Sequence, residues 1–339
     1  MCDVYYDLLL VLCVLICLTK SSLSLQYSIR PSDVIRLRCS LDAKDEVIFQ
    51  FEGQVYGEIE SDNIQFLFRT IGMNIGRCIV KDRDGNYLLI SREILLYLHP
   101  HTEKKLKTWL NPYTNKSINI VHIANDFVQI PFPNMNYNVT LSSTNPTSKP
   151  TTTYVSLEQT IPLKYPNSYY KNDSYLLYAP QEFYEAEEYF NFQCLLHDFQ
   201  THKVSIPSVS VLWNRASQFA PFMQMGQLAP KGRLHYTSVG YKLPMTSNHT
   251  QDVLALHPLL QHELRFRVPL YNHAPCHGGC GHELNTSLVR SMTSWEYFGQ
   301  HLTEYIQGHE FPIPVNKSGV DSFCMCTGNG TDSLPGNYH

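Results

Sequence analysis

The sequence predicts an all-β or β-rich α+β protein, built as a single antiparallel barrel-like or strongly curved sheet with one C-terminal amphipathic helix. Three observations favour this fold class. Apolar and polar residues alternate over residues 47–57, as they do in a half-buried strand. Strand-like segments recur roughly every 10–20 residues with turn signals between them, as in an antiparallel meander. The 22 Tyr and 16 Phe of the 339-residue chain suit strands and apolar pockets.

The predicted strands fall into two groups along the chain. Those of the first group cover residues 47–57, 64–71, 75–81, 87–98 and 117–124. The segment DRDGN at 82–86 predicts a hairpin turn within this group, because Gly85 tolerates a positive φ. Those of the second group cover residues 188–198, 207–214 and 232–243.

A polar stretch separates the two groups. Ser, Thr, Pro and Asn dominate residues 138–174, which predicts a long loop insertion. Neither group obviously closes a sheet alone, whereas one shared barrel avoids exposed strand edges. We therefore expect a single domain over residues 25–310.

The C-terminal helix has a clear start and stop. Thr293 and Glu296 form a capping box, and Gly308 ends the helix. One apolar stripe runs along it, comprising Met292, Trp295, Phe298, Leu302 and Tyr305. We expect this helix to plug or flank the sheet.

The N-terminus resembles a secretory signal peptide. The apolar run LLLVLCVLICL at residues 8–18 is too short to span a bilayer, and Ser22 and Ser24 suit cleavage after residue 24. Asp3 and Asp7 are unusual for such a segment, so a retained anchor is the alternative. We expect a secreted protein, with no stable membrane span after cleavage. The net charge of −4 and the absence of a basic block indicate no nucleic-acid partner.

Glycosylation sequons and cysteines agree with the secretory pathway. Seven Asn-x-Ser/Thr sequons lie mostly in turn-like stretches. They begin at Asn115, Asn138, Asn172, Asn248, Asn285, Asn316 and Asn329. Cys276 and Cys280 are expected to pair with Cys324 and Cys326, which would tether the tail 311–339 to the domain. Cys194, in the apolar run FNFQCLL, is expected to be a buried free thiol.

Zinc is the alternative for the cysteines near residue 280. His273, His277 and His282 accompany Cys276 and Cys280 at short spacing, which is compatible with zinc ligation. The oxidising compartment favours disulfides instead, so we expect no metal.

Five segments, in order, resemble blocks of the domain of unknown function 1838 (DUF1838) family. They are FRTIGMN at 68–74, SREILLY at 91–97, WLNPYT at 109–114 joined to INIVHIAND at 118–126, WNR at 213–215 with PFMQMG at 221–226, and TSWEYF at 293–298. Order and approximate spacing agree over residues 45–305. The chain departs from the family pattern at Asn115, Phe127 and Asn214, where Gly, Pro and Ser are usual. The resemblance implies a secreted eukaryotic member, no established activity and no cofactor.

Polar residues in these blocks are the candidates for chemistry. His122 shares a strand face with Ile118, Ile120 and Ala124, so it could lie in an apolar interior beside Asn125 and Asp126. The simpler interpretation is a hydrogen-bonded core histidine.

Three charged residues interrupt apolar strands, namely Arg69, Glu93 and Arg215. Each of these residues, taken alone, suits a strand face that is exposed to solvent. Together they suggest an internal network, for example Arg69 with Glu93.

An apolar ligand wall is the remaining candidate site. Trp109, Asn111, Trp213, Met223 and Met225 are expected to line it, because aromatic and Met side chains adapt to irregular apolar ligands. Ordinary core packing is an equally good interpretation of the same residues.

Three functional hypotheses follow. The leading one is a secreted glycoprotein that binds a small apolar or amphipathic ligand inside a β-barrel. The second is an enzyme on the same scaffold, with isomerase- or cyclase-like acid–base chemistry by His122, Asp126 and Glu93. The third is an extracellular interaction protein without a small-molecule site.

Overall fold

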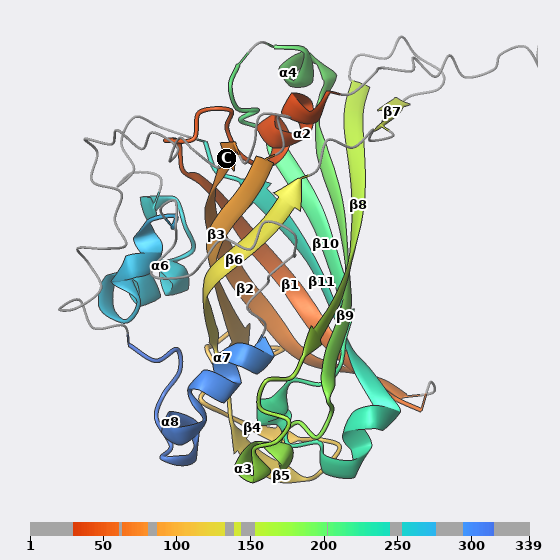
Figure 1. Cartoon of the computed structure of the whole chain (residues 1–339), viewed down its shortest axis with the longest axis vertical. Helices are drawn as coiled ribbons and strands as arrows, with labels where there is room; N and C mark the ends of the chain where they lie inside the picture. Colours follow the sequence, from red (N-terminus) through yellow and green to blue (C-terminus); the bar gives the residue numbers. More distant parts are fainter. Residues whose placement is uncertain are drawn as a thin grey trace, which may run out of the picture.

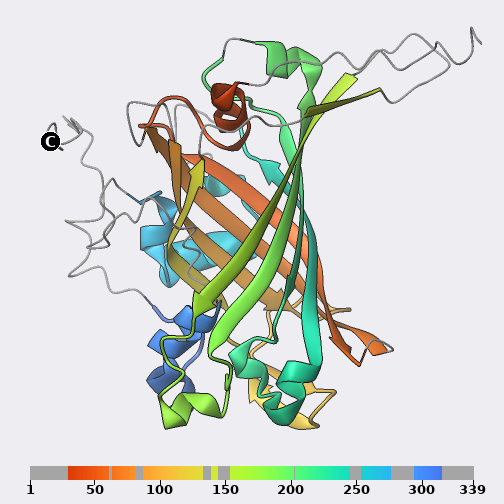
Figure 2. The ribbon, with the colours of Figure 1, turned by 45° about the vertical axis from the view of Figure 1, so that its right-hand side comes forward.

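The two strand groups of the sequence belong to one sheet. The computed structural model describes residues 30–60, 63–80, 87–132, 139–143, 153–201, 203–244, 253–275 and 294–314. Nine antiparallel strands follow one another in the order β6-β3-β2-β1-β11-β10-β9-β8-β7. The sheet curls into a half-barrel, which Figures 1 and 2 show from two sides. The predicted strand-rich fold with a strongly curved sheet is confirmed.

The first arm of the half-barrel contains the strands of the N-terminal group. They are β1 (Val47–Ile59), β2 (Asn63–Val80), β3 (Tyr87–Leu98) and β6 (Ile123–Phe132). The segments predicted at 64–71 and 75–81 form one continuous strand. The segment predicted at 117–124 is divided, because its first residues form β5 (Lys116–Asn119), which pairs with β4 (Thr108–Asn111) in a separate small sheet.

The second arm contains five strands. They are β11 (Gly232–Lys242), β10 (Val209–Ser217), β9 (Phe183–Leu195), β8 (Thr153–Pro166) and β7 (Val139–Ser143). The expectation that residues 138–174 form only a loop was wrong. Their polar residues hid a long strand, since β8 pairs along its whole length with β9 and its apolar residues alternate from Val155 to Leu163.

Antiparallel pairing of β1 with β11 joins the two arms, from Phe49 opposite Lys242 to Ile59 opposite Gly232. Contacts across the interior follow from the curl. The Tyr97 hydroxyl on β3 lies 3.1 Å from that of Tyr236 on β11, although two strands separate them. On a flat sheet those strands would lie about 14 Å apart.

At Gly240, opposite Phe51, a Cβ would lie 2.5 Å from the Phe51 ring, so the absent side chain makes room for that ring.

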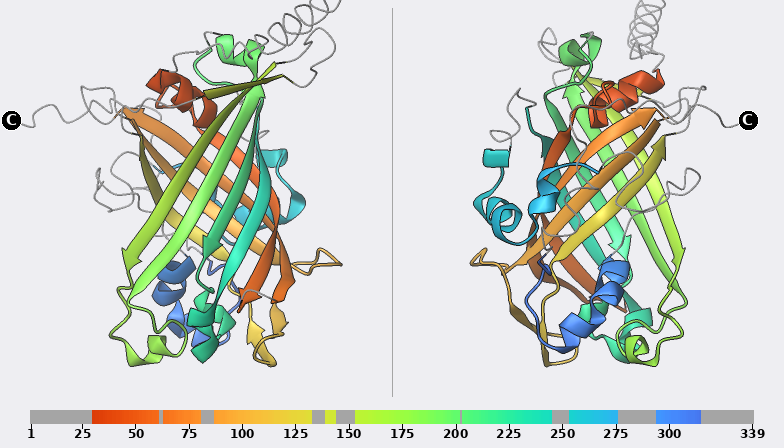
Figure 3. Two further views of the ribbon diagram at one scale, coloured as in Figure 1. Left: turned by 90° about the vertical axis from the view of Figure 1, so that its right-hand side faces the viewer. Right: turned by 60° about the vertical axis from the view of Figure 1, so that its left-hand side comes forward.

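Short helices close the ends and cover one flank of the half-barrel. Helices α2 (Pro31–Arg38) and α4 (Leu196–Gln200) lie at one end, and α3 (Asp173–Leu176) lies at the other (Figure 1). Three 3-10 turns add to these elements: η1 (Pro221–Met223), η2 (Gly226–Lys231) and η3 (Pro269–Asn272). Helix α6 (Pro258–Phe266) lies outside the sheet, as the two views of Figure 3 show. None of the helices in the described ranges is long and apolar enough to cross a membrane.

The predicted C-terminal helix is present as two shorter ones. They are α7 (Ser294–Gln300) and α8 (Leu302–Ile306), separated at His301. The apolar stripe is nevertheless buried at Trp295, Phe298, Leu302 and Tyr305, and Gly308 has a φ of +76°. The stripe packs in the core at the end of the half-barrel opposite α2.

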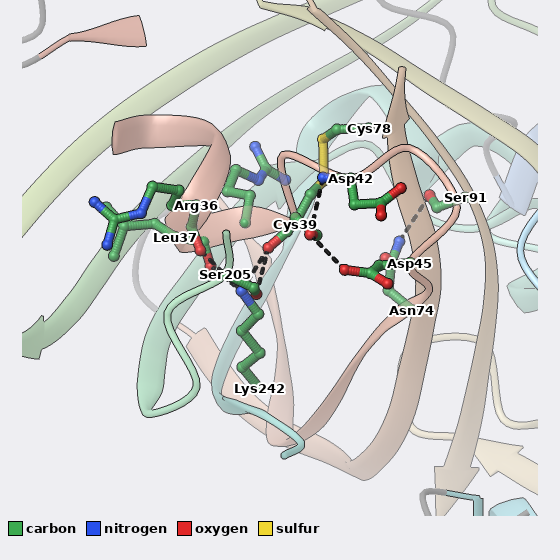
Figure 4. Close-up of a disulfide and its surroundings, with 12 residues drawn as sticks. Arg36, Leu37, Cys39, Asp42, Asp45, Asn74, Cys78, Ser91, Ser205 and Lys242 are labelled. Atoms are coloured by element: carbon green, nitrogen blue, oxygen red, sulfur yellow. Dashed lines mark hydrogen bonds between the residues drawn. A yellow bond between two sulfur atoms is a disulfide. The ribbon is translucent and has the colours of Figure 1, made fainter. Parts of the chain in front are cut away.

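A disulfide and a lysine hold α2 in place (Figure 4). Cys39, directly after the helix, is bonded to Cys78 of β2. Lys242 of β11 donates hydrogen bonds to the carbonyl groups of Arg36, Leu37 and Cys39, at 2.9, 3.2 and 2.8 Å. These carbonyls belong to the last turn of α2, where a cation is favourable.

The remaining cysteine predictions have mixed outcomes. The Cys39–Cys78 bridge was not predicted. Cys194 is a buried free thiol, as expected. The four cysteines expected to tether the tail, Cys276, Cys280, Cys324 and Cys326, lie outside the described residues.

We predict that replacing both Cys39 and Cys78 by Ser lowers the free energy of unfolding by about 3–4 kcal/mol, because the bridge closes a loop of 39 residues in the unfolded chain. Chemical denaturation of both proteins measures the difference. The control compares the same two proteins in reducing agent, where the difference should shrink by the contribution of the bridge. A difference that reduction leaves unchanged would show that the bridge is not its cause.

Candidate functional site

A cavity of about 120 Å³ lies inside the curl of the sheet. Aromatic and aliphatic side chains form most of its wall, including Phe49, Phe51, Leu89, Val128, Ile130, Phe190, Phe192 and Trp213. Its polar lining comprises Arg38, Asn74, Glu93, Tyr97, Asn125, Glu188, Arg215 and Tyr236. Charged groups in such a place need partners, because an unpaired buried charge is costly.

Strand register brings one set of polar residues together on the first arm. Asn125, Glu93 and Asn74 stand directly opposite one another on β6, β3 and β2. Asn74 donates from Nδ2 to Glu93 Oε1 at 2.9 Å, and Asn125 also hydrogen-bonds the Glu93 carboxyl group. Glu93 thus lies between two amides on the inner face.

A second set faces it from the other arm. Glu188, Arg215 and Tyr236 stand opposite one another on β9, β10 and β11. Arg215 Nη1 lies 3.4 Å from Glu188 Oε1. The guanidinium carbon lies 5.6 Å from the ring centre of Tyr184 and 6.0 Å from that of Tyr236, within the range of cation–π attraction.

Arg38 reaches the cavity from the end of α2. Its guanidinium carbon lies 4.9 Å from the Phe192 ring centre and 5.1 Å from that of Phe190. Nη1 also donates to Gln159 Oε1 at 2.9 Å. Helix α2 therefore supplies a cation to the cavity.

Burial decides the protonation of the two carboxyl groups. It raises the pKa of Glu188 to about 8, with a further increase from the nearby Glu93. Burial also raises the pKa of Glu93, although the hydrogen bond from Asn74 and the charge of Arg215 act in the opposite direction. Burial lowers the pKa of Arg215. A pKa of about 8 favours the protonated form of the Glu188 carboxyl group at neutral pH.

Comparison with known protein families identifies the chain. The model of the family described as protein of unknown function, DUF1838, matches residues 44–302. The chain belongs to the DUF1838 family. Comparison with curated proteins found no match.

Four DUF1838 blocks seen in the sequence lie on cavity strands. The block at 68–74 lies on β2 and contributes Asn74, and the block at 91–97 lies on β3 and contributes Glu93 and Tyr97. The block at 118–126 reaches β6 and contributes Asn125, and the block at 213–215 lies on β10 and contributes Trp213 and Arg215. The matched region therefore includes both polar sets, whereas Arg38 precedes it.

Four of the predicted site residues line the cavity, namely Glu93, Asn125, Trp213 and Arg215. The proposed pairing of Arg69 with Glu93 was wrong. Arg69 is half exposed; its Nε donates to the Pro100 carbonyl group at 3.0 Å, and its Nη1 lies 3.3 Å from Glu103. It is one residue out of phase with Thr70 and Gly72, so it points to the opposite face of β2.

His122 is buried away from the cavity wall. Its Nδ1 accepts a hydrogen bond from the Tyr97 backbone N–H at 3.0 Å, so its Nε2 donates to the Leu106 carbonyl group at 2.8 Å. Burial lowers its pKa to about 3, and the nearby charge of Lys105 acts in the same direction. This geometry favours the core-histidine interpretation. The side chain of Asp126, its expected partner, lies outside the described residues.

The other expected wall residues belong to the packed end of the half-barrel. Asn111 is fully buried, and its Nδ2 donates to the Met223 carbonyl group at 2.7 Å. Met225 lies beside it, and Trp109 packs on Phe68 with ring centres 4.7 Å apart. Core packing is thus the role that the structure assigns to Trp109, Asn111, Met223 and Met225.

Sequence reasoning missed Glu188, although a signal was present. The alternating residues Tyr184, Ala186, Phe190 and Phe192 share one face of β9, and Glu188 has the same parity. A charge on an apolar strand face marks an internal polar site. No comparable signal existed for Arg38, because only the packing of α2 brings it to the sheet.

Two sequons can be placed. Asn115 and Asn172 are exposed in turns of the described chain, and the other five, Asn138, Asn248, Asn285, Asn316 and Asn329, lie outside it. No group of His, Cys, Asp and Glu that could hold a metal ion occurs within the described ranges. Of the five candidate zinc ligands, only His273 is described.

We predict that Glu188 makes folding pH-dependent. Between its ordinary pKa of 4.5 and its folded value of about 8, the folded protein holds a proton that the unfolded chain lacks. The free energy of unfolding should therefore fall as pH rises through this window, by up to about 1.4 kcal/mol per pH unit from this group. Denaturation at a series of pH values should show that Glu188→Gln flattens this slope.

Glu185→Gln is the matched control, because Glu185 lies on the same strand with its side chain exposed. It should leave the slope unchanged. Identical slopes in wild type and Glu188→Gln would contradict the buried, protonated state of Glu188.

We predict that His122 is a structural residue. His122→Ala should lower the free energy of unfolding by about 2–5 kcal/mol, because it leaves a void and two unpaired buried backbone groups. His262→Ala, which truncates a mostly exposed imidazole on α6, should change stability by no more than about 0.5 kcal/mol. Thermal and chemical denaturation compare the two, and a fully stable His122→Ala would exclude this role.

Proposed function

We propose that the protein binds a small amphipathic molecule in the cavity of its half-barrel. The observation that carries this proposal is the composition of the cavity wall, which combines a mostly apolar lining with a few converging charged and amide groups. Binding sites for small molecules usually have this character, since apolar walls provide affinity and a few polar groups fix orientation.

The size of the cavity limits the ligand. An engineered protein cavity of about 150 Å³ binds benzene. At about 120 Å³, this cavity accommodates a body about the size of a single ring or a short branched chain. Phe49, Phe51 and Phe192 would contact the apolar body, while Glu93, Arg215 and Tyr236 face its polar end.

Acid–base catalysis on the bound molecule is a second candidate function. It is supported by two carboxyl groups in one cavity whose pKa values are both raised, to about 8 for Glu188. A carboxyl group with a pKa near the working pH is suited to proton transfer. In this hypothesis Glu93 and Glu188 are the acid–base pair, and His122 is not. Conversion of a bound molecule by wild type but not by Glu188→Gln would support it.

We also propose that the protein works in the secretory pathway as a glycoprotein. The support is the signal-like N-terminus, the seven sequons and the Cys39–Cys78 bridge. Exposed Asn115 and Asn172 are the sequons to test first. Mass spectrometry of the protein secreted from eukaryotic cells would show glycans there, and a purely cytosolic protein without glycans would overturn this proposal.

We predict that filling the cavity abolishes binding. Val128 is buried on the inner face of β6, so Val128→Phe places a ring in the cavity. A panel of one-ring amphipathic molecules (indole, phenol, phenylacetate and 2-phenylethylamine) should include at least one ligand of the wild type in calorimetric titration. Val128→Phe should weaken that ligand at least about tenfold.

Val239→Phe is the matched control, since it makes the same substitution on the exposed outer face of β11. It should leave affinity unchanged. Ile130→Phe, at a second cavity position, replaces Val128→Phe if the latter does not fold. The proposal fails if no molecule of the panel binds, or if the cavity-filled variants bind the ligand as tightly as the wild type does.

A further inference from the structure

We propose that the cavity selects an acidic amphipathic ligand, whose carboxylate binds the edge of Arg215 formed by Nε and Nη2 while its apolar body lies against the aromatic wall. This inference rests on the proposed function, because it names the chemical class of the molecule bound in the same cavity. It concerns a binding site that neither the family nor the fold assigns.

Arg215 has hydrogen-bonding capacity that the described residues do not use. Its guanidinium group has five N–H donors, and Nη1 is the nitrogen close to Glu188. Nε and Nη2 are buried and have no hydrogen-bond partner within the part of the chain that the structure describes. Buried donors without acceptors are unfavourable, so an acceptor supplied by a ligand would relieve this cost.

The carboxyl groups of the cavity, in contrast, already have hydrogen-bond donors. Glu93 accepts from Asn74 and Asn125, and Glu188 accepts from Trp213 and lies beside Arg215. Among the described residues, Asn125 Oδ1 on the other arm is a buried acceptor without a hydrogen-bond partner, which suits a hydroxyl or N–H group elsewhere on the ligand. At Arg215, however, the surplus consists of donors, so the complementary ligand group is an acceptor.

The charge of the cavity lining also favours an anionic ligand. Two guanidinium groups and two carboxyl groups line the cavity, and the pKa of about 8 leaves Glu188 neutral at pH 7. The lining therefore has a net positive charge at neutral pH. An anion is the ligand that balances it, whereas an ammonium group would add to it.

The geometry of the guanidinium group specifies the type of anion. The Nε and Nη2 edge presents two parallel N–H bonds, which match the two oxygen atoms of a carboxylate. Trp213 lies two residues from Arg215 on the same face of β10, and Tyr236 is directly opposite it on β11. A carboxylate at this edge thus leaves its apolar substituent beside aromatic rings.

The competing ligand class is an amine held between Glu93 and Glu188. Three molecules of nearly equal size separate the classes: phenylacetate, neutral 2-phenylacetamide and cationic 2-phenylethylamine. Calorimetric titration of the wild-type full chain at pH 7 should show phenylacetate binding at least about tenfold more tightly than either of the others. This comparison does not depend on any variant folding.

Arg215→Gln should remove the preference, so that phenylacetate loses at least about tenfold in affinity while the amide still binds. Arg215→Lys keeps the positive charge but lacks the paired donors, and should lose part of the preference. Arg69→Gln is the matched control: it removes an arginine from the opposite face of the sheet and should leave all three affinities unchanged.

The outcomes separate this inference from the proposed function. Tightest binding of the amine, or equal binding of all three molecules, would overturn the carboxylate assignment while binding in the cavity stands. Loss of phenylacetate affinity in Arg69→Gln but not in Arg215→Gln would also overturn it. If none of the three binds and Val128→Phe changes nothing for any molecule of the wider panel, both proposals fail together.

Discussion

Pairing of β1 with β11 is the interaction on which the rest of the structure depends. It joins strands almost 200 residues apart in sequence and makes one sheet of two arms. Because the sheet curls at this junction, the inner faces of both arms enclose a common interior. The contact between the Tyr97 and Tyr236 hydroxyl groups and the packing of Phe49 against Phe192 exist only because of this curl. Without the junction, Glu93 and Glu188 would belong to separate surfaces.

The interior has two ends of different character. One end is a packed core of Phe68, Phe222, Trp295 and Phe298, in which the polar groups of Asn111 and His122 are bound by the backbone. The other end remains open as a cavity, under a helix that the Cys39–Cys78 bridge and Lys242 hold in place. Arginine and glutamate side chains face that cavity. Polar groups that hydrogen-bond the backbone serve stability, whereas the Arg215 donors that have no partner among the described residues point to recognition.

Alternate residues of a strand point to opposite faces of the sheet, and this alternation explains which site residues could be found from the sequence. Glu93 and Arg215 interrupt apolar runs and do face the cavity, and Glu188 could have been found by the same rule. Arg69 interrupts such a run too, but it is out of phase with Asn74 and faces outward. The turn-like composition of residues 138–174 concealed β8, although its apolar residues alternate with polar ones as in a half-buried strand. The family resemblance located four of the cavity strands, β2, β3, β6 and β10, without saying which face of each strand is inside.

The sequence by itself determined the class of the fold, its strand-rich course from residue 47 to residue 243, the buried apolar stripe of the last helices and the family. These properties depend on local periodicity and on composition, which neighbouring residues encode. Only the tertiary structure decided that Glu93 faces Glu188 and Arg215, that Arg38 joins them, and that His122 does not. Those relations depend on strand register, on sheet curvature and on the position of α2 against the sheet. All three are set by contacts between residues far apart in the chain.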